Sequence, residues 1–153
     1  MKKIPSSDYK KILDTMPVAC VDLLIYHDGK VLLVLRKDEP AKNEWFVPGG
    51  RIFKNEKLED AAIRKAFEEV GIDIKIEKQI GCFDFFAEKG SFENINDGIH
   101  TISVVYLCSL KNPDQTIKID STSADAKWFD VKNKKDLEKA HPYVKNLIKG
   151  AGI

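Results

Sequence analysis

The segment from Pro48 to Gly71 restricts the fold more than any other part of the chain. It opens with the sharp turn Pro48-Gly49-Gly50 and continues into a helical pattern over 58–70, which Gly71 is placed to close. We predict Asn55 as the N-cap of this helix. Apolar residues recur at intervals of three and four and form one arc, which consists of Leu58, Ala62, Ile63, Ala66, Phe67 and Val70. A helix with one apolar side is expected to lie against a core.

Runs rich in β-branched residues and leucine predict strands on both sides of this helix. Two of them, 18–26 and 31–35, flank His27-Asp28-Gly29-Lys30, in which Asp-Gly is a strong signal for a hairpin turn. Further strands are predicted at 72–86, 99–110 and 128–131, and helices at 6–16 and 141–148. The pattern indicates an α/β fold, and the long loop 88–98 is a candidate border of a site.

The length of the chain predicts one domain, and its charge excludes some partners. With 153 residues, 1–153 is expected to form a single domain with 1–17 as an N-terminal helical arm. Because 25 basic residues face 24 acidic ones, the net charge of +1 argues against nucleic-acid binding through bulk charge. The sequence has neither a membrane-spanning apolar stretch nor a secretory signal, so we expect a cytoplasmic protein without a membrane partner. Cys20, Cys82 and Cys108 are expected in the core.

Glu69 is placed where a helix that packs on a core does not tolerate an unpaired charge. On the helical wheel it falls inside the apolar arc, and a buried carboxylate has to be ion-paired or bound to a metal. Glu68 lies nearby on the wheel, together with Lys65 and Arg64, and adjacent carboxylates favour a hard divalent cation. Mg²⁺ is the natural candidate, with Mn²⁺ as a substitute, because Mg²⁺ needs only one or two protein carboxylates beside water and substrate phosphates.

Other residues near the turn fit a phosphate site, and each has a simpler alternative. Gly49-Gly50 allows backbone groups to approach a metal or phosphate closely, while Arg36 and Arg51 are placed to hold phosphate oxygens. The arginines are otherwise solvated surface residues, and the helix carboxylates otherwise form surface ion pairs worth roughly 0.2–0.5 kcal/mol each. Asp22 interrupts an apolar run, which the solvent side of a half-buried strand explains equally well.

The same segment carries the pattern of a known family. It resembles the Nudix box, Gx5Ex7REUxEExGU with U apolar, at every specified position except one, through Gly50-x5-Glu56-x7-Arg64-Lys65-Ala66-Phe67-Glu68-Glu69-Val70-Gly71-Ile72. The resemblance implies a Nudix-type α/β/α sandwich with a mixed central sheet, and a Mg²⁺-dependent hydrolase of a nucleoside diphosphate linked to another group. It further implies that the Gly50 carbonyl, Glu68 and Glu69 bind the metal. Glu56 and Arg64 then brace the loop against the helix.

Lys65 stands where the family has Glu, and this departure points to one branch. GDP-mannose mannosyl hydrolases also lack that carboxylate and bind one metal, and the chain resembles them in Val21-Asp22-Leu23, Arg36 and Trp45-Phe46-Val47-Pro48-Gly49-Gly50-Arg51. The resemblance implies that water attacks the anomeric carbon of a nucleotide sugar such as GDP-mannose. Asp22 then contacts the substrate, Arg36 and Arg51 act on the leaving group, and the ammonium disfavours a second cation. The branch pairs through its N-terminal segment, so a homodimer is expected.

The general base has no obvious counterpart in this sequence. The mannosyl hydrolases have a Gln-His pair shortly before the strand that corresponds to Trp128-Phe129, whereas this chain has Ser121-Thr122-Ser123-Ala124-Asp125. We predict that the base is His100, Glu93 or Asp125. His100 is the first choice, because it lies where a loop leads into a strand and imidazole accepts a proton near neutral pH.

Two other functions stay open. One is a Nudix pyrophosphatase that attacks phosphorus in ADP-ribose, in nucleotide sugars or in damaged nucleoside triphosphates such as oxidised ones. The other is a catalytically inactive domain that binds a nucleotide and thereby regulates a partner. Retention of the box residues argues against the inactive domain, because a decayed site need not keep Gly50, Glu56, Arg64, Glu68 and Glu69.

Overall fold

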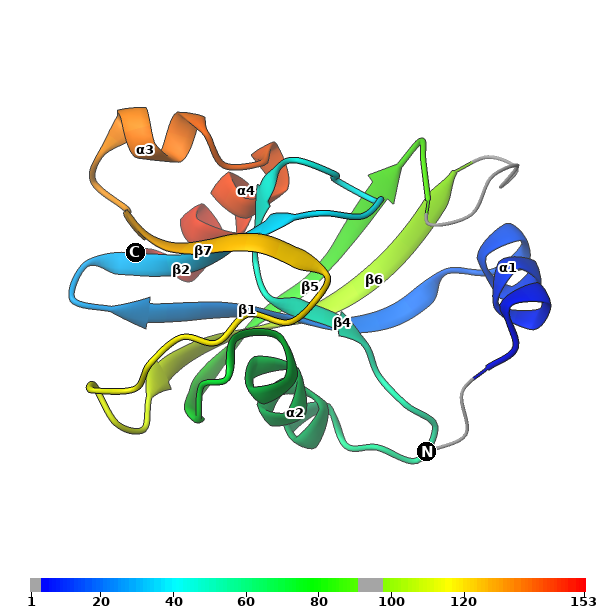
Figure 1. The fold of residues 1–153 in the computed structure, drawn as a ribbon, viewed down its shortest axis with the longest axis horizontal. Helices are drawn as coiled ribbons and strands as arrows, with labels where there is room; N and C mark the ends of the chain where they lie inside the picture. The colour runs from blue at the N-terminus through cyan, green and yellow to red at the C-terminus, as the bar shows by residue number, and fades with distance from the viewer. Residues whose placement is uncertain (1–3, 91–97) are drawn as a thin grey trace.

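Within the described residues, 4–90 and 98–153 of this computed structural model, seven strands form one mixed sheet (Figure 1). In chain order the elements are α1 (Ser6–Thr15), β1 (Val18–His27), β2 (Lys30–Arg36), β3 (Trp45–Phe46), β4 (Gly49–Arg51), α2 (Leu58–Val70), β5 (Ile74–Ala87), β6 (Ile99–Leu110), β7 (Ser123–Asp130), α3 (Lys134–Glu138) and α4 (Pro142–Ala151). The strand order is β3-β2-β1-β6-β5, with β4 paired to β1 and β7 paired to β2. β1 and β6 are parallel and the other pairs are antiparallel, which confirms the predicted mixed sheet.

The hairpin of β1 and β2 follows directly from its turn residues. His27 pairs with Lys30, so that Asp28 and Gly29 alone connect the two strands. Asp28 has a φ of 46° and Gly29 a φ of 77°, the left-handed conformation that a two-residue hairpin turn requires and that Asp-Gly adopts readily. The hairpin predicted from the sequence is therefore confirmed.

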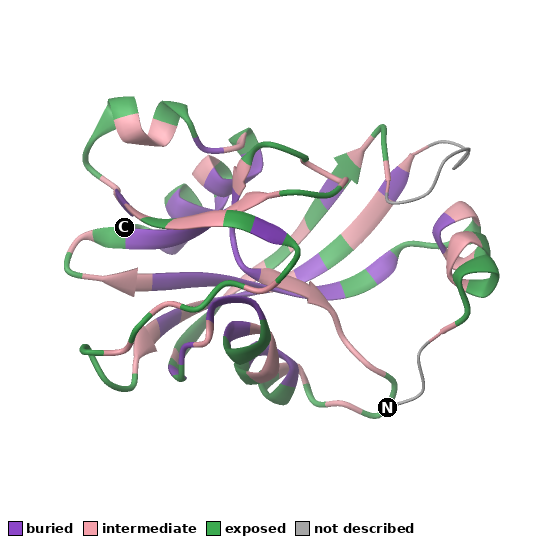
Figure 2. Cartoon of the chain, in the orientation of Figure 1, coloured by how far each residue is buried: buried purple, intermediate pink, exposed green. Residues whose placement is uncertain are grey.

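Helices α2 and α4 cover opposite faces of the sheet (Figure 1). Val21 and Leu23 of β1 share one core cluster with Ala66 of α2, whereas the intervening Leu24 belongs to a second cluster with Leu147 of α4. Because both faces are covered, β1 is a nearly unbroken apolar run and its middle is buried throughout (Figure 2). The predicted α/β/α sandwich is confirmed. None of the described helices is long and apolar enough to cross a bilayer.

Helix α2 ends as predicted but begins differently. Gly71 follows its last residue with a φ of 65°, and the Gly71 amide donates to the Phe67 carbonyl at 3.0 Å. The prediction of Asn55 as the N-cap is wrong, because Asn55 lies in the preceding turn with a φ of 67°. Lys57 occupies the N-cap position without a side-chain hydrogen bond.

The buried face of α2 is narrower than the predicted arc. Ile63 and Phe67 are 38% and 63% exposed, so the prediction that they face the core is wrong. Ala62 and Ala66 are fully buried, and their small side chains allow the helix to lie close to the sheet. The buried face is centred on these alanines, and it includes Glu69 at 8% exposure, as the helical wheel predicts.

The C-terminal segment contains more regular structure than the sequence predicts. Strand β7 begins at Ser123 and not at Trp128, because its pairing with β2 extends back from Asp130 to Ser123. The charged run that follows forms the short helix α3. The Asn133 side chain caps α3 by accepting from the backbone amide of Asp136 at 3.4 Å.

Helix α1 packs against one end of the sheet and not on either of its faces. Leu13 of α1 forms a small cluster with Val18, Cys20 and Ile99. Cys20 and Cys108 are buried, as predicted. Cys82 is exposed on β5, at the edge of the sheet, so the prediction that it belongs to the core is wrong.

Candidate active site

A cavity of about 200 Å³ lies where α1, β1, β4 and the start of β6 meet. Its lining includes four of the residues predicted for the site, which are Asp22, Arg36, Gly50 and Arg51. They belong to three different strands. The antiparallel pairing of β4 with β1, in which Asp22 lies opposite Gly49, brings them together. The predicted substrate contacts and the glycine turn therefore meet in one place.

Glu69 reaches from α2 to the glycine turn. Its Oε2 accepts from the Gly49 amide at 3.1 Å, and its Oε1 lies 2.6 Å from Lys65 Nζ. Burial raises the pKa of the Glu69 carboxyl, and the Lys65 ammonium opposes that shift. Both carboxylate oxygens are thus engaged, as a carboxylate in a core requires.

The glycine turn has room for hydrogen atoms only. A Cβ atom at Gly49 would collide with Asp22 Oδ1 and with the Val21 carbonyl oxygen. Gly50 has a φ of 144°, which side-chain-bearing residues rarely adopt, and a Cβ atom there would lie 2.9 Å from Lys65 Cε. The two glycines therefore allow β4 to lie directly against both β1 and the Lys65 side chain.

Arg64 braces the loop that joins β4 to α2. Its Nε and Nη2 donate to the two Glu56 carboxylate oxygens at 2.6 and 2.8 Å, and Nη2 also donates to the Arg51 carbonyl at 3.2 Å. Its guanidinium lies 3.9 Å from the centre of the Phe53 ring. Hydrogen bonding to Arg64 lowers the pKa of Glu56. This geometry is the bracing that the family resemblance implies for Arg64 and Glu56.

Arg36 and Arg51 line the same cavity and are each supported by aromatic rings. Arg36 lies 5.9 Å from the Phe46 ring centre, and its Nε donates to the Pro40 carbonyl at 2.6 Å. Arg51 lies 5.1 Å from the ring centre of Tyr9 in α1. A guanidinium held against an aromatic face keeps a defined position, which suits the binding of planar or tetrahedral anions.

Asp22 is buried at the cavity, with only 7% of its surface exposed. Its Oδ2 accepts a hydrogen bond from Tyr143 Oη at 2.7 Å. Burial raises the pKa of Asp22 to about 6, while the hydrogen bonds from Tyr143 and Ser103 oppose the shift. The interpretation of Asp22 as the solvent side of a strand is wrong, because β1 is covered on both faces. Sequence analysis missed Tyr143, which no local pattern connects with Asp22.

The predicted base candidates are not brought to the cavity. His100 Nε2 lies 2.9 Å from Asp84 Oδ1, and its ring stacks on Phe86 with centroids 4.4 Å apart. The β5–β6 register places His100 opposite Phe86, and His100 is not among the described residues that line the cavity. Asp125 pairs with Lys127 at 3.2 Å and does not line the cavity either. Glu93 lies outside the described residues.

The donors near the glycine turn fit one hard cation. They are the carboxylates of Glu69 and Glu68 and the backbone carbonyl of Gly50, all oxygen atoms, which suit Mg²⁺ and not zinc. Within the described part of the chain, no three or more His, Cys, Asp or Glu side chains converge as a metal site. Glu68 Oε2 accepts from Arg64 at 3.0 Å. So sparse a set fits an ion that completes its shell with water and substrate phosphates.

Comparison with known proteins finds relatives that match most of the chain. The family model described as NUDIX domain matches residues 16–149. The low-salt glycan biosynthesis protein Agl8 of Haloferax volcanii is 38% identical over 146 residues, which cover 95% of this chain and 89% of that protein. An ADP-ribose pyrophosphatase of Methanocaldococcus jannaschii is 30% identical over 133 residues, covering 86% of this chain and 73% of the relative.

A solved structure shares the fold at lower identity. The MutT NUDIX hydrolase from Burkholderia pseudomallei superposes with a TM-score of 0.71 and is 21% identical in sequence. The match covers 88% of this chain and 98% of that one. The sandwich with its flanking helices is therefore an architecture already seen by experiment.

Proposed function

The chain belongs to the Nudix hydrolase family, and from this premise we propose that it hydrolyses a nucleoside diphosphate sugar, with a GDP-hexose such as GDP-mannose as the first candidate. Nudix hydrolases act on nucleoside diphosphate-linked substrates and generally use divalent metals. The observation that carries the proposal is the meeting of Arg36, Arg51 and the Gly49-Gly50 turn around one cavity. Two guanidinium groups beside a metal-binding turn match the charge of a diphosphate.

The products we propose are the free sugar and the nucleoside diphosphate. Water attacks the anomeric carbon, the bond from that carbon to the phosphate oxygen breaks, and its electron pair leaves with the diphosphate. Arg36 and Arg51 hold the diphosphate and stabilise the charge that develops on it. Gly50, Glu68 and Glu69 would hold Mg²⁺, which would supply positive charge for the same leaving group.

We assign the proton of the attacking water to Asp22. Among the described residues that line the cavity, Asp22 is the carboxylate that is buried, and Tyr143 holds it in place. A pKa near 6 suits a group that is ionised at neutral pH and still accepts a proton readily. This assignment replaces His100 and Asp125, both of which lie away from the cavity.

Sugar chemistry is favoured by the relative from Haloferax volcanii, which is named for glycan biosynthesis. Glycan assembly consumes activated sugars, and nucleoside diphosphate sugars are a common form of them. Attack at carbon is favoured by Lys65, because one metal ion suffices to stabilise a leaving diphosphate and an ammonium discourages a second ion.

The test is turnover of a panel of nucleoside diphosphate sugars with Mg²⁺ in ¹⁸O-labelled water. We expect label in the free sugar and none in the nucleoside diphosphate. Label in a phosphate group would instead establish attack at phosphorus. That second function, pyrophosphatase activity, is favoured by the 30% identity to the ADP-ribose pyrophosphatase, so ADP-ribose belongs in the panel. Binding without turnover across the panel would leave the inactive, regulatory domain as the conclusion.

A further inference from the structure

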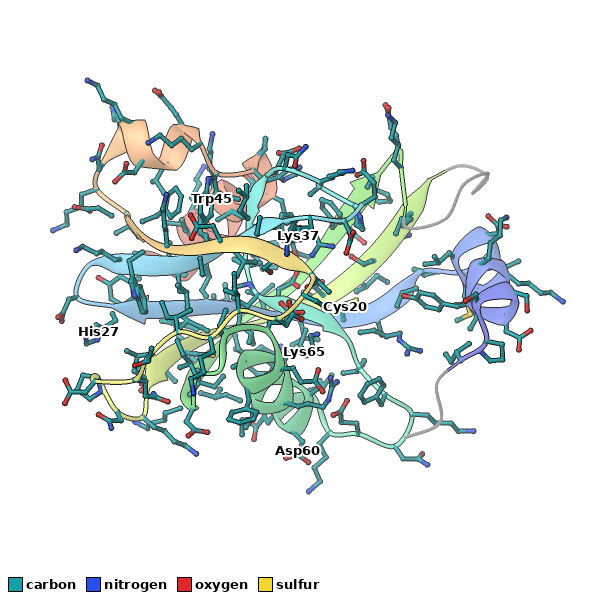
Figure 3. All side chains as sticks on the ribbon, in the orientation of Figure 1. Cys20, His27, Lys37, Trp45, Asp60 and Lys65 are labelled. Atoms are coloured by element: carbon teal, nitrogen blue, oxygen red, sulfur yellow. The ribbon has the colours of Figure 1, made fainter. Side chains whose placement is uncertain are left out.

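The side chain of Lys65 lies beside the residues assigned to the proposed metal site. Lys65 lies on the face of α2 that is turned towards the sheet, opposite the exposed Asp60 (Figure 3). Its side chain is only 16% exposed, which is unusual for a lysine. The Lys65 side chain packs against Gly50. A Cβ atom added at Gly50 would lie 2.9 Å from Lys65 Cε and 3.3 Å from Lys65 Nζ.

Both carboxylates assigned to the metal lie near this ammonium, and Gly50, which carries the third group, packs against the same side chain. Nζ lies 2.6 Å from Glu69 Oε1 and 3.7 Å from Glu68 Oε2, and it passes close to the Gly50 backbone. The other oxygen of Glu69 is held by the Gly49 amide at 3.1 Å. Both oxygens of Glu69 are therefore engaged while Lys65 stays in place, and a metal ion that binds Oε1 competes with the ammonium there.

We propose that the Lys65 ammonium is the resident cation of the metal-free site, and that a divalent ion binds by displacing it from Glu69 Oε1. The inference rests on the metal site of the proposed function, but it does not depend on which substrate is cleaved. Lys65 thereby sets the affinity of the site for metal and limits it to one ion.

Electrostatics give the reason for an exchange. A buried carboxylate without a counter-charge is strongly destabilising, so Glu69 needs a cation at all times. An ammonium and a divalent ion on the same carboxylate oxygen repel each other strongly in a partly buried site. The incoming ion therefore has to replace the contact between Lys65 Nζ and Glu69 Oε1. The free energy of breaking this contact is subtracted from the binding free energy of the ion, so the ion binds more weakly.

In the experiment, the metal-free protein is titrated with Mn²⁺ in the absence of substrate. Electron paramagnetic resonance measures the concentration of free Mn²⁺ and thereby the fraction that is bound. Lys65→Met removes the ammonium and keeps the length of the side chain. Lys57→Met is the matched control, because it removes the same charge from an exposed position next to the same helix. We expect Lys65→Met to bind Mn²⁺ about tenfold more tightly than the wild type, and Lys57→Met to stay within about twofold.

A second variant and a second measurement keep the proposal testable if Lys65→Met does not fold. Lys65→Gln serves if circular dichroism shows that Lys65→Met does not fold. Mn²⁺ is expected to raise the melting temperature of either Lys65 variant more than that of the wild type, because tighter binding stabilises the folded state further. Lys65→Glu is expected to bind two Mn²⁺ ions per chain where the wild type binds one.

Equal or weaker Mn²⁺ binding by the Lys65 variants would overturn the exchange, as would the absence of Mn²⁺ binding in every variant. The proposed reaction fails separately. If Lys65→Met gains affinity as expected but the wild type cleaves no nucleotide sugar, the exchange stands and the proposed substrate is wrong.

Discussion

Tyr143 Oη donates a 2.7 Å hydrogen bond to Asp22 Oδ2 and so connects helix α4 to the carboxylate at the cavity. The two residues are 121 positions apart in the chain. The Tyr143 ring stacks on Phe46 with centroids 5.3 Å apart and planes 5° from parallel, which fixes where its hydroxyl lies. The Asp22 side chain is thus held by a residue from the helix on one face of the sheet, whereas Glu69 comes from the helix on the other face.

Removal of the Tyr143 hydroxyl is expected to destabilise the fold and to change the titration of Asp22. In Tyr143→Phe the buried carboxylate loses a hydrogen-bond donor, which costs about 1–3 kcal/mol. Loss of that bond also raises the pKa of Asp22 further, so the acid limb of the pH–rate profile moves to higher pH. Urea unfolding and the profile measure the two effects. An acid limb at the wild-type pH would separate Asp22 from proton transfer.

Asp22→Asn is expected to lower turnover strongly and yet to stabilise the protein at alkaline pH. Burial raises the pKa of Asp22 in the folded protein to about 6. The Asp22 carboxyl therefore contributes fully to the free energy of unfolding below the unfolded pKa near 4, and this contribution is lost as pH rises through 6. The loss amounts to about 3 kcal/mol at most. Asn avoids it, so urea unfolding should favour the variant at pH 8 and show little difference at pH 4. Turnover should fall about 10²–10⁴-fold.

Glu69→Gln is expected to lose Mn²⁺ binding and turnover while the fold persists. Gln keeps the shape and can still accept from the Gly49 amide, but it leaves the Lys65 ammonium without its partner at 2.6 Å. Calorimetric titration with Mn²⁺ and a nucleotide-sugar assay measure the losses, and circular dichroism confirms the fold. Wild-type turnover in Glu69→Gln would remove Glu69 from the metal site.

Arg64→Met is expected to loosen the loop between β4 and α2. It removes both bonds to Glu56 and the bond to the Arg51 carbonyl, and we expect a loss of about 1–3 kcal/mol in urea unfolding. Because Arg51 lines the cavity, KM for the nucleotide sugar should rise as well. Glu56→Gln keeps one acceptor for Arg64 and should be milder, so a larger loss in that variant would contradict the bracing role.

The local elements of this protein could be predicted from sequence because they depend on backbone periodicity. The Asp28-Gly29 turn determines the hairpin, and the spacing of small apolar residues determines which side of α2 is buried, with Glu69 on that side. The Nudix box lies within one such local segment, and its resemblance to the family implied the contact of Arg64 with Glu56 that the structure contains.

The errors concern positions where the neighbours come from elsewhere in the chain. Ile63 and Phe67 belong to an apolar pattern but remain exposed, because nothing in the described structure covers that side of α2. His100 has the chemistry of a base, but the β5–β6 register turns it to Asp84.

The sequence by itself therefore determined the hairpin and the inward position of Glu69, and through its resemblance to the Nudix box it implied the sandwich. Only the tertiary structure decided that Asp22 lines the cavity and accepts a hydrogen bond from Tyr143. It likewise decided that the Lys65 ammonium lies near the carboxylates of Glu68 and Glu69. The physical reason is that helix and strand periodicity are properties of neighbouring residues. The partner of a buried charge, in contrast, depends on how separate layers pack together.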